Sequence, residues 1–198
     1  MENVIIGAGG FAREVRCQMH SENIKMFVDD EYWIENNDNI FSLKYFDANK
    51  HIAVIAIGNP KDREDMVNKL PLDTQYFTFI HKTAQILSND IVIGLGSIIC
   101  ANCIITTNVK LGRHTHLNLS STIGHDCLIG DFFTTAPGVK ISGKCNIGNR
   151  VYFGTNSSIR EKITVCNDVT VGLNSGVVKN IIETGTYGGV PVKKLLSK

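Results

Sequence analysis

His125 is the side chain whose neighbours best suit it to acid–base chemistry. It follows Gly124 and directly precedes Asp126 and Cys127. Imidazole exchanges a proton near neutral pH, so His125 is suited to take a proton from a reacting group. Two other interpretations stay open at this point. An isolated histidine is often only a surface residue, and a cysteine beside a histidine resembles a thiol nucleophile.

His114 and His116 form a second group that could carry chemistry, because histidines at this spacing project to one side of a strand and can share a metal ion. No third histidine occupies a matching repeat position, and Cys100-x-x-Cys103 has no second pair to complete a zinc site. We therefore expect no metal, and we expect His114 and His116 to occupy solvated edge positions.

A glycine pattern near the start of the chain predicts a phosphate-binding turn. Gly7-x-Gly9-x-x-Ala12 separates an apolar run from a helical segment, and Asp29 and Asp30 follow about twenty residues later, which is the spacing of a dinucleotide-binding motif. The unit is too short for a two-lobed NAD-binding domain, so we expect the nucleotide part of a smaller ligand. Alternatively, the glycines only form a tight turn between strand and helix.

The first 80 residues predict a β-α-β unit with a parallel sheet. Strands are expected at 4–6, in a segment that ends at residue 30, and at 52–57, and helices are expected at 13–20 and 61–69. A short strand within 76–80 should lead into the second domain. We assign residues 1–80 to this Rossmann-like domain and residues 81–198 to a second domain of different architecture.

Large apolar residues recur at every sixth position in the second domain, with Thr135 as the exception. No α-helix has a period of six, whereas short strands joined by tight corners fit this spacing. Three hexapeptides per triangular coil predict a left-handed parallel β-helix in which residues 18 apart stack. Thr135 interrupts its apolar column and is expected to cost about 1 kcal/mol of burial. The recurring residues are Ile93, Ile99, Ile105, Leu111, Leu117, Ile123, Ile129, Ile141, Ile147, Phe153, Ile159, Val165, Val171 and Val177.

The stacking gives His125 specific neighbours. Thr107 falls one coil below it and Gly143 one coil above, and a bare glycine leaves room for a thioester and offers an N–H to an oxyanion. Cys127 falls at a small-residue position that points into the prism, as do Cys103 and Cys145, which disfavours the nucleophile interpretation. We expect all six cysteines to be thiols in a reducing compartment.

Composition excludes some functions. The 198 residues carry a net charge of +1 without a broad basic surface, so nucleic acid is not an expected partner. The sequence shows no leader-like segment and no apolar run of membrane-spanning length, which predicts a cytoplasmic protein without a membrane partner.

Several stretches taken in order resemble a known family. They are Ile5-Ile6-Gly7-Ala8-Gly9-Gly10-Phe11-Ala12-Arg13-Glu14, Ala56-Ile57-Gly58-Asn59, Leu117-Asn118, His125-Asp126-Cys127-Leu128-Ile129-Gly130-Asp131, and Gly189-Val190-Pro191-Val192-Lys193. The chain resembles the sugar O-acyltransferases that include sialic acid O-acetyltransferases. It is most similar to bacterial N-acetyltransferases of nucleotide-linked 4-amino-6-deoxysugars, which act in cell-surface polysaccharide biosynthesis.

The resemblance implies a homotrimer that moves acetyl from acetyl-CoA to a sugar amine, with His125 as general base and Asp126 tuning it. It implies substrate contacts by Gly9, Gly10, Phe11, Asp29, Asp30, Gly58 and Asn118, and acetyl-CoA contacts by Thr134, Gly143, Thr155 and Leu173. Two positions depart from the family pattern: Thr134 replaces a histidine of a relative, and Val192 follows Pro191 where alanine is usual. The alternatives are O-acetylation of a sugar hydroxyl and a non-catalytic trimer that binds nucleotide sugars.

Overall fold

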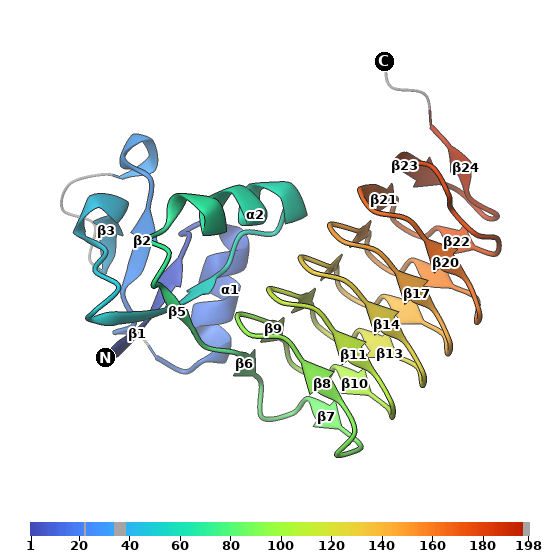
Figure 1. Ribbon diagram of the computed structural model, residues 1–198, viewed down its shortest axis with the longest axis horizontal. Helices are drawn as coiled ribbons and strands as arrows, with labels where there is room; N and C mark the ends of the chain where they lie inside the picture. Colours follow the sequence, from blue (N-terminus) through green and yellow to red (C-terminus); the bar gives the residue numbers. More distant parts are fainter. Residues whose placement is uncertain (22, 34–38, 196–198) are drawn as a thin grey trace.

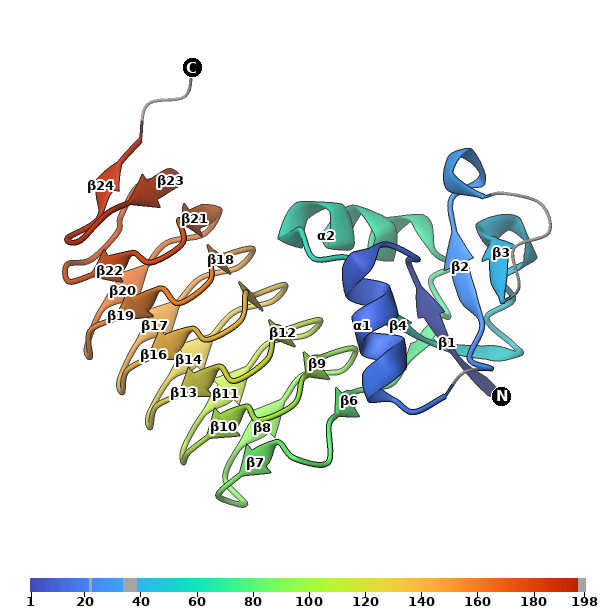
Figure 2. The same ribbon diagram turned by 180° about the vertical axis from the view of Figure 1, so that it is seen from behind.

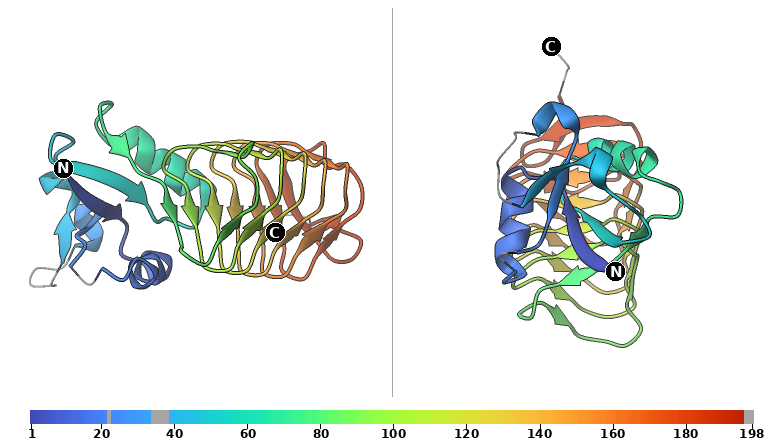
Figure 3. Two further views of the ribbon diagram at one scale, coloured as in Figure 1. Left: turned by 90° about the horizontal axis from the view of Figure 1, so that it is seen from below. Right: turned by 90° about the vertical axis from the view of Figure 1, so that its left-hand side faces the viewer.

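The computed structural model describes residues 1–21, 23–33 and 39–195. These residues form a small α/β unit that lies beside a three-sided prism of stacked coils (Figures 1 and 2). Two further views show the coils stacked along one direction, with the α/β unit beside the earlier coils (Figure 3). None of the helices in the described ranges is long and apolar enough to cross a membrane.

The α/β unit has a five-stranded parallel sheet with the spatial order β3-β2-β1-β4-β5. The sequence does not indicate β3, because three residues are too few to show an alternating pattern. Its strands are β1 (Glu2–Ile6), β2 (Met26–Val28), β3 (Ile40–Ser42), β4 (His51–Ile55) and β5 (Gln75–Tyr76). Its helices are α1 (Gly10–Gln18), α2 (Pro60–Lys69) and the short 3-10 helices Asp30–Tyr32 and Leu43–Tyr45.

Local sequence fixes the two turns that follow the central strands β1 and β4. Gly7, after β1, has φ +113°, and a Cβ there would lie 3.1 Å from the Ala56 carbonyl oxygen, so only glycine fits this turn. Asn59, after β4, caps α2 because its side-chain oxygen accepts hydrogen bonds from the N–H groups of Lys61 and Asp62. Both turns lie at the carboxyl edge of the sheet.

The prism is a left-handed parallel β-helix, as the repeat predicts, and within residues 92–177 residues 18 apart pair in register along each face. The first face contains β6 (Phe79–Ile80), β9 (Ile98–Ile99), β12 (His116–Leu117), β15 (Thr134–Thr135), β18 (Tyr152–Phe153), β21 (Val169–Val171), β23 (Gly185–Gly188) and β24 (Lys193–Lys194). The second contains β7 (Gln85–Ile86), β10 (Ile104–Ile105), β13 (Thr122–Ile123), β16 (Lys140–Ile141), β19 (Ser158–Ile159) and β22 (Gly176–Val177). The third contains β8 (Val92–Ile93), β11 (Lys110–Leu111), β14 (Leu128–Ile129), β17 (Asn146–Ile147) and β20 (Thr164–Val165).

The interior of the prism contains the expected apolar columns, and Thr135 is a buried polar group with hydrogen-bond partners. All six cysteines are free, and Cys103, Cys127 and Cys145 are buried in it. Thr135 is buried in place of an apolar residue, but its hydroxyl oxygen lies 3.0 Å from the Asn118 backbone nitrogen and 2.9 Å from Ser121 Oγ. These hydrogen bonds offset the loss of apolar burial that the sequence predicts for Thr135.

The α/β unit is joined to the prism by Arg63, a fully buried arginine on α2. Its Nε donates to the His114 carbonyl oxygen at 3.0 Å, and Nη2 donates to the Phe132 carbonyl oxygen at 2.9 Å and to Thr134 Oγ1 at 2.7 Å. Within the α/β unit, Nη1 donates to the Ile57 carbonyl oxygen at 2.6 Å. The guanidinium therefore connects the turn after β4 to two successive coils, and burial lowers the pKa of Arg63 to about 9.

His114 and His116 lie in the same interface, so the expectation that they occupy solvated edge positions is wrong. They are 2% and 0% exposed, because the α/β unit covers the face of the prism to which they belong. The His116 ring lies 5.0 Å from the Phe11 ring, and the His114 ring stacks on Phe132 at 5.3 Å. Burial lowers the pKa of His114 to about 4 and that of His116 well below the ordinary value, so both are neutral near pH 7.

Replacing Arg63 with methionine should destabilise the protein strongly. The substitution keeps much of the buried volume but leaves several buried carbonyl groups without a donor, at an expected cost of about 3 kcal/mol in the free energy of unfolding. Urea denaturation followed by circular dichroism measures this. Arg113→Met is the matched control, because Arg113 is an exposed arginine whose nearest carboxylate oxygen, on Asp131, is 3.5 Å away. Equal, small losses from both variants would contradict the role given to Arg63.

Candidate functional site

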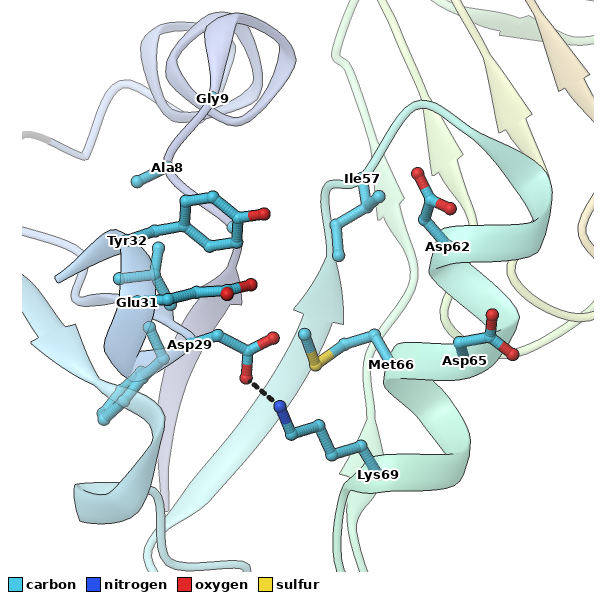
Figure 4. Close-up of a pocket in the computed structure, with 13 residues that line it drawn as sticks. Ala8, Gly9, Asp29, Glu31, Tyr32, Ile57, Asp62, Asp65, Met66 and Lys69 are labelled. Carbon is cyan, nitrogen blue, oxygen red and sulfur yellow. Dashed lines mark hydrogen bonds and ion pairs between the residues drawn. The ribbon is translucent and has the colours of Figure 1, made fainter.

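A cavity of about 700 Å³ lies at the carboxyl ends of β1, β2 and β4, where a nucleotide binds in doubly wound sheets. Gly7, Ala8 and Gly9 line one side of it. Figure 4 shows Asp29, Glu31 and Tyr32 facing residues of α2 across the opening. The predicted phosphate-binding turn therefore borders a cavity at the position expected for a nucleoside. We call it the nucleoside cavity.

The two predicted acidic residues of this region point to different partners. Asp29 lines the nucleoside cavity and forms an ion pair with Lys69 of α2 (Figure 4). The Asp30 carboxylate instead accepts a hydrogen bond from Ser42 Oγ on β3, and Asp30 lines a neighbouring depression. Asp29 is thus the acid that a bound nucleoside would meet, while Asp30 ties β3 to the segment that follows β2.

A second cavity, of about 350 Å³, lies between the α/β unit and the first face of the prism. We call it the interdomain cavity. It brings together six of the predicted ligand-binding residues: Gly10, Phe11, Gly58, Asn118, Thr134 and Thr155.

The N-terminus of α1 lies between the two cavities, because Gly9 lines the nucleoside cavity and Gly10 lines the interdomain cavity. Gly9 is the N-cap residue and has no side chain that could accept a hydrogen bond from the N–H groups of the first turn. A Cβ added at Gly9 or Gly10 would meet nothing within 4 Å. The free N–H groups of the first turn are therefore open to an anion that reaches from one cavity into the other.

Thr134, where a relative has histidine, is occupied by the domain interface. Its hydroxyl accepts from Arg63 Nη2 and lies 3.3 Å from the Gly58 carbonyl oxygen. Asn118 lies beside it in the same cavity, and its Oδ1 accepts from the Leu119 N–H at 2.7 Å. The Oδ1 atom of Asn118 is therefore occupied within the chain, and the Thr134 hydroxyl is engaged with Arg63 in the cavity wall.

His125 and Asp126 form a hydrogen-bonded pair at the corner between the second and third faces. His125 Nδ1 lies 2.8 Å from Asp126 Oδ2, and hydrogen bonding to His125 is the main cause of the lowered pKa of Asp126. Gly143 lies against the ring, as the repeat predicts: a Cβ there would be 2.5 Å from His125 Nε2. Within the described chain, the Gly143 N–H donates no hydrogen bond.

Cys127 is unsuited to nucleophilic attack. It is 2% exposed, and its thiol lies 3.3 Å from the Ser142 carbonyl oxygen inside the prism. Hydrogen bonding with Cys145 and burial raise the pKa of Cys127, which keeps it protonated. The structure thus disfavours the covalent alternative raised by the neighbouring histidine.

The predicted residues fall into two groups on this chain. His125, Asp126 and Gly143 share one corner, but they line neither the nucleoside cavity nor the interdomain cavity. The exposed Leu173 stands one 18-residue step beyond Thr155, at the corner between the first and second faces. We call the corner that carries His125 one half-site, and the nucleoside cavity and the interdomain cavity together the other half-site.

Sequence reasoning missed Arg63, Tyr32 and Met66. The last two line the nucleoside cavity and carry no motif. Arg63 did leave a signal, because it falls between Pro60 and Met66 at three-residue steps on the buried side of α2. A charged residue within an otherwise buried helical stripe indicates a buried polar contact.

Comparisons with known proteins agree with this architecture. Residues 3–70 match the family model of the PglD N-terminal domain. GDP-perosamine N-acetyltransferase of Escherichia coli O157:H7 is 29% identical over 172 residues, which cover 80% of this chain and 78% of that protein. WeeI from Acinetobacter baumannii AYE is 30% identical, with a TM-score of 0.87, over 98% of this chain and 100% of its own. The acetyltransferase domain of PglB from Neisseria gonorrhoeae FA1090, solved in complex with acetyl coenzyme A, is 25% identical, with a TM-score of 0.87, over 98% of each chain.

The fold and these comparisons together define a left-handed β-helix acyltransferase of the hexapeptide-repeat kind. The chain belongs to the family of sugar acetyltransferases that join a PglD-type N-terminal domain to this β-helix.

Gly143→Ala should reduce catalysis without unfolding the prism. The new methyl group would overlap the His125 ring and force it to turn, so kcat should fall by about tenfold or more. Steady-state assays with both substrates varied measure this, and Ser142→Ala serves as the control because it alters the adjacent residue without adding volume. Wild-type kcat in a folded Gly143→Ala variant would show that the ring position in this structure does not matter for catalysis.

Proposed function

We propose that this protein transfers the acetyl group of acetyl-CoA to the amino group of a nucleotide-linked amino-deoxysugar, with His125 as general base. The observation that carries the proposal is the His125–Asp126 pair, whose free ring nitrogen Nε2 lies over a glycine with an unused N–H. The family relatives named as a GDP-perosamine N-acetyltransferase and as a domain bound to acetyl coenzyme A support the same chemistry.

The arrangement of the two cavities suits a nucleotide sugar. The nucleoside occupies the cavity bordered by Asp29, and the diphosphate binds the N–H groups at the start of α1. The sugar then reaches the interdomain cavity beside Phe11 and Asn118. We accordingly assign residues 1–80 to nucleotide-sugar binding and residues 81–198 to acetyl-CoA binding and catalysis, with Thr155, Leu173 and Gly143 toward acetyl-CoA.

The chemistry is direct transfer between the two bound substrates. Asp126 accepts from Nδ1–H of His125, which leaves the Nε2 lone pair free to take a proton from the sugar amine. The amine nitrogen attacks the thioester carbonyl carbon, and the Gly143 N–H donates to the oxyanion that forms. The carbon–sulfur bond then breaks, and the CoA thiolate leaves and accepts the proton held by His125.

Two alternatives use the same fold. A sugar hydroxyl could replace the amine as the acceptor, or the protein could bind nucleotide sugars without catalysis. Mass spectrometry after incubation with acetyl-CoA and candidate amino sugars separates them: the proposal requires a product one acetyl group heavier and modified on nitrogen. We propose a cytosolic location, in keeping with the six free thiols.

The active site is proposed to form between neighbouring subunits of a homotrimer. The support is the separation of the two half-sites on one chain, because a threefold ring brings the His125 corner of one prism toward the cavities of the next. Multi-angle light scattering should give about three times the 21.8 kDa of one chain. A monomer that stays active at micromolar concentration would exclude the shared site.

His125→Ala should lower kcat by about 10²-fold or more with little change in the KM for acetyl-CoA, because the base acts on the transition state. Asp126→Asn should lower kcat less, since its carboxylate only supports the base. Exposed His20 provides the control, and His20→Asn suits its positive φ of 50°. His116 is unsuitable as a control because it is buried in the domain interface. If His125→Ala keeps more than about a third of the wild-type kcat, another group takes the proton.

A further inference from the structure

A ladder of polar side chains runs along the corner of the prism that carries the base. Asp90, Asn108, Asp126 and Lys144 stand 18 residues apart, one on each successive coil. Asn108, Asp126 and Lys144 all have left-handed backbone conformations, with φ of 50°, 59° and 61°. Asparagine and aspartate adopt this conformation more readily than most residues, so the corner can present their side chains in a stack.

Both oxygens of Asp126 are engaged in this stack. Oδ2 accepts from His125 Nδ1 at 2.8 Å, and Oδ1 accepts from Asn108 Nδ2 at 2.7 Å. After the contribution of His125, hydrogen bonding from Asn108 further lowers the pKa of Asp126. With Oδ1 tied to the coil below, rotation of the carboxylate is restricted and Oδ2 stays directed at the imidazole.

Asn108 is itself anchored from the coil beneath it. Its backbone N–H donates to Asp90 Oδ1 at 2.8 Å, and Thr107 Oγ1 lies 3.0 Å from Asp90 Oδ2. The Asp126 N–H in turn donates to the Thr107 carbonyl oxygen at 3.1 Å. Asn108 therefore occupies a fixed position relative to Asp126, and none of these three contacts involves a proposed substrate-binding residue.

We propose that Asn108 is a positioning residue that orients Asp126 toward His125 and thereby holds the imidazole with its proton on Nδ1 and its lone pair on Nε2. This inference rests on the proposed function, in which Nε2 receives the proton of the amine. Asn108 is suited to the role because its amide donates a hydrogen bond without adding charge. An aspartate of the same size has no donor at neutral pH and would repel Asp126.

The test measures kcat and both KM values for Asn108→Ala and Asn108→Asp, each in the wild-type and in the Asp126→Asn background. In the wild-type background, Asn108→Ala should lower kcat about fivefold, which is less than the full value of a hydrogen bond to a charged group because Asn108 acts on the base only through Asp126. Asn108→Asp should lower kcat further. Both KM values should change by less than about twofold, because Asn108 contacts neither substrate. In the Asp126→Asn background, Asn108→Ala should have almost no effect on kcat.

Asn102→Ala is the matched control. Asn102 is also an exposed asparagine at a corner with φ of 60°, so the substitution imposes the same backbone strain away from the His125 corner. It should leave kcat unchanged, and circular dichroism should show both Asn102→Ala and Asn108→Ala folded at the assay temperature.

Two results would overturn the proposal: unchanged kcat in Asn108→Ala, or an equal loss of kcat with and without the Asp126 carboxylate. If the proposed role of His125 is wrong instead, His125→Ala and Asp126→Asn should each retain activity with Asn108 unchanged, so the two failures are distinguishable.

Discussion

The buried guanidinium of Arg63 is the interaction on which the arrangement of the whole site depends. A charged group without a carboxylate partner is costly to bury, and here carbonyl oxygens from both domains satisfy it. Because a guanidinium has five donors in a rigid plane, these hydrogen bonds define one relative placement of the α/β unit and the prism. The walls of the interdomain cavity, formed by Gly58 on one side and Thr134 on the other, inherit that placement.

The prism and its stacking register could be predicted from the sequence because the repeat acts through local geometry. A six-residue period fixes which residues point inward, and an 18-residue step places Gly143 over His125 without any knowledge of the α/β unit. The Gly7 turn and the presence of two helices were predictable for the same reason, although α1 begins at Gly10 and ends at Gln18, whereas the sequence predicted a helix at 13–20. The short strand β3 was not, since three residues paired at a sheet edge carry no period.

The interface between the two domains could not be predicted from the repeat. His116 has the same outward position as many exposed residues of the prism, and only the covering α/β unit makes it a buried neutral imidazole. Thr135 similarly reads as a defect in an apolar column until its hydrogen bond to the Asn118 backbone is known. In both cases, contacts between residues distant in sequence decide the role of a side chain, and hydrophobic periodicity carries no information about them.

The last strand of the chain has a consequence for solubility. Among the described strands, all pairs along the faces of the prism are parallel except β23 with β24, which run antiparallel. A stack of identical coils would otherwise end in an open parallel edge, onto which the first coil of another molecule could add in the same register and begin a fibre. The strand β24 reverses direction at the end of the first face and covers part of that edge. It carries two lysines, and its orientation does not match that of an incoming coil. Removing this short segment would expose a template for end-to-end polymerisation, even though it lies far from the half-sites.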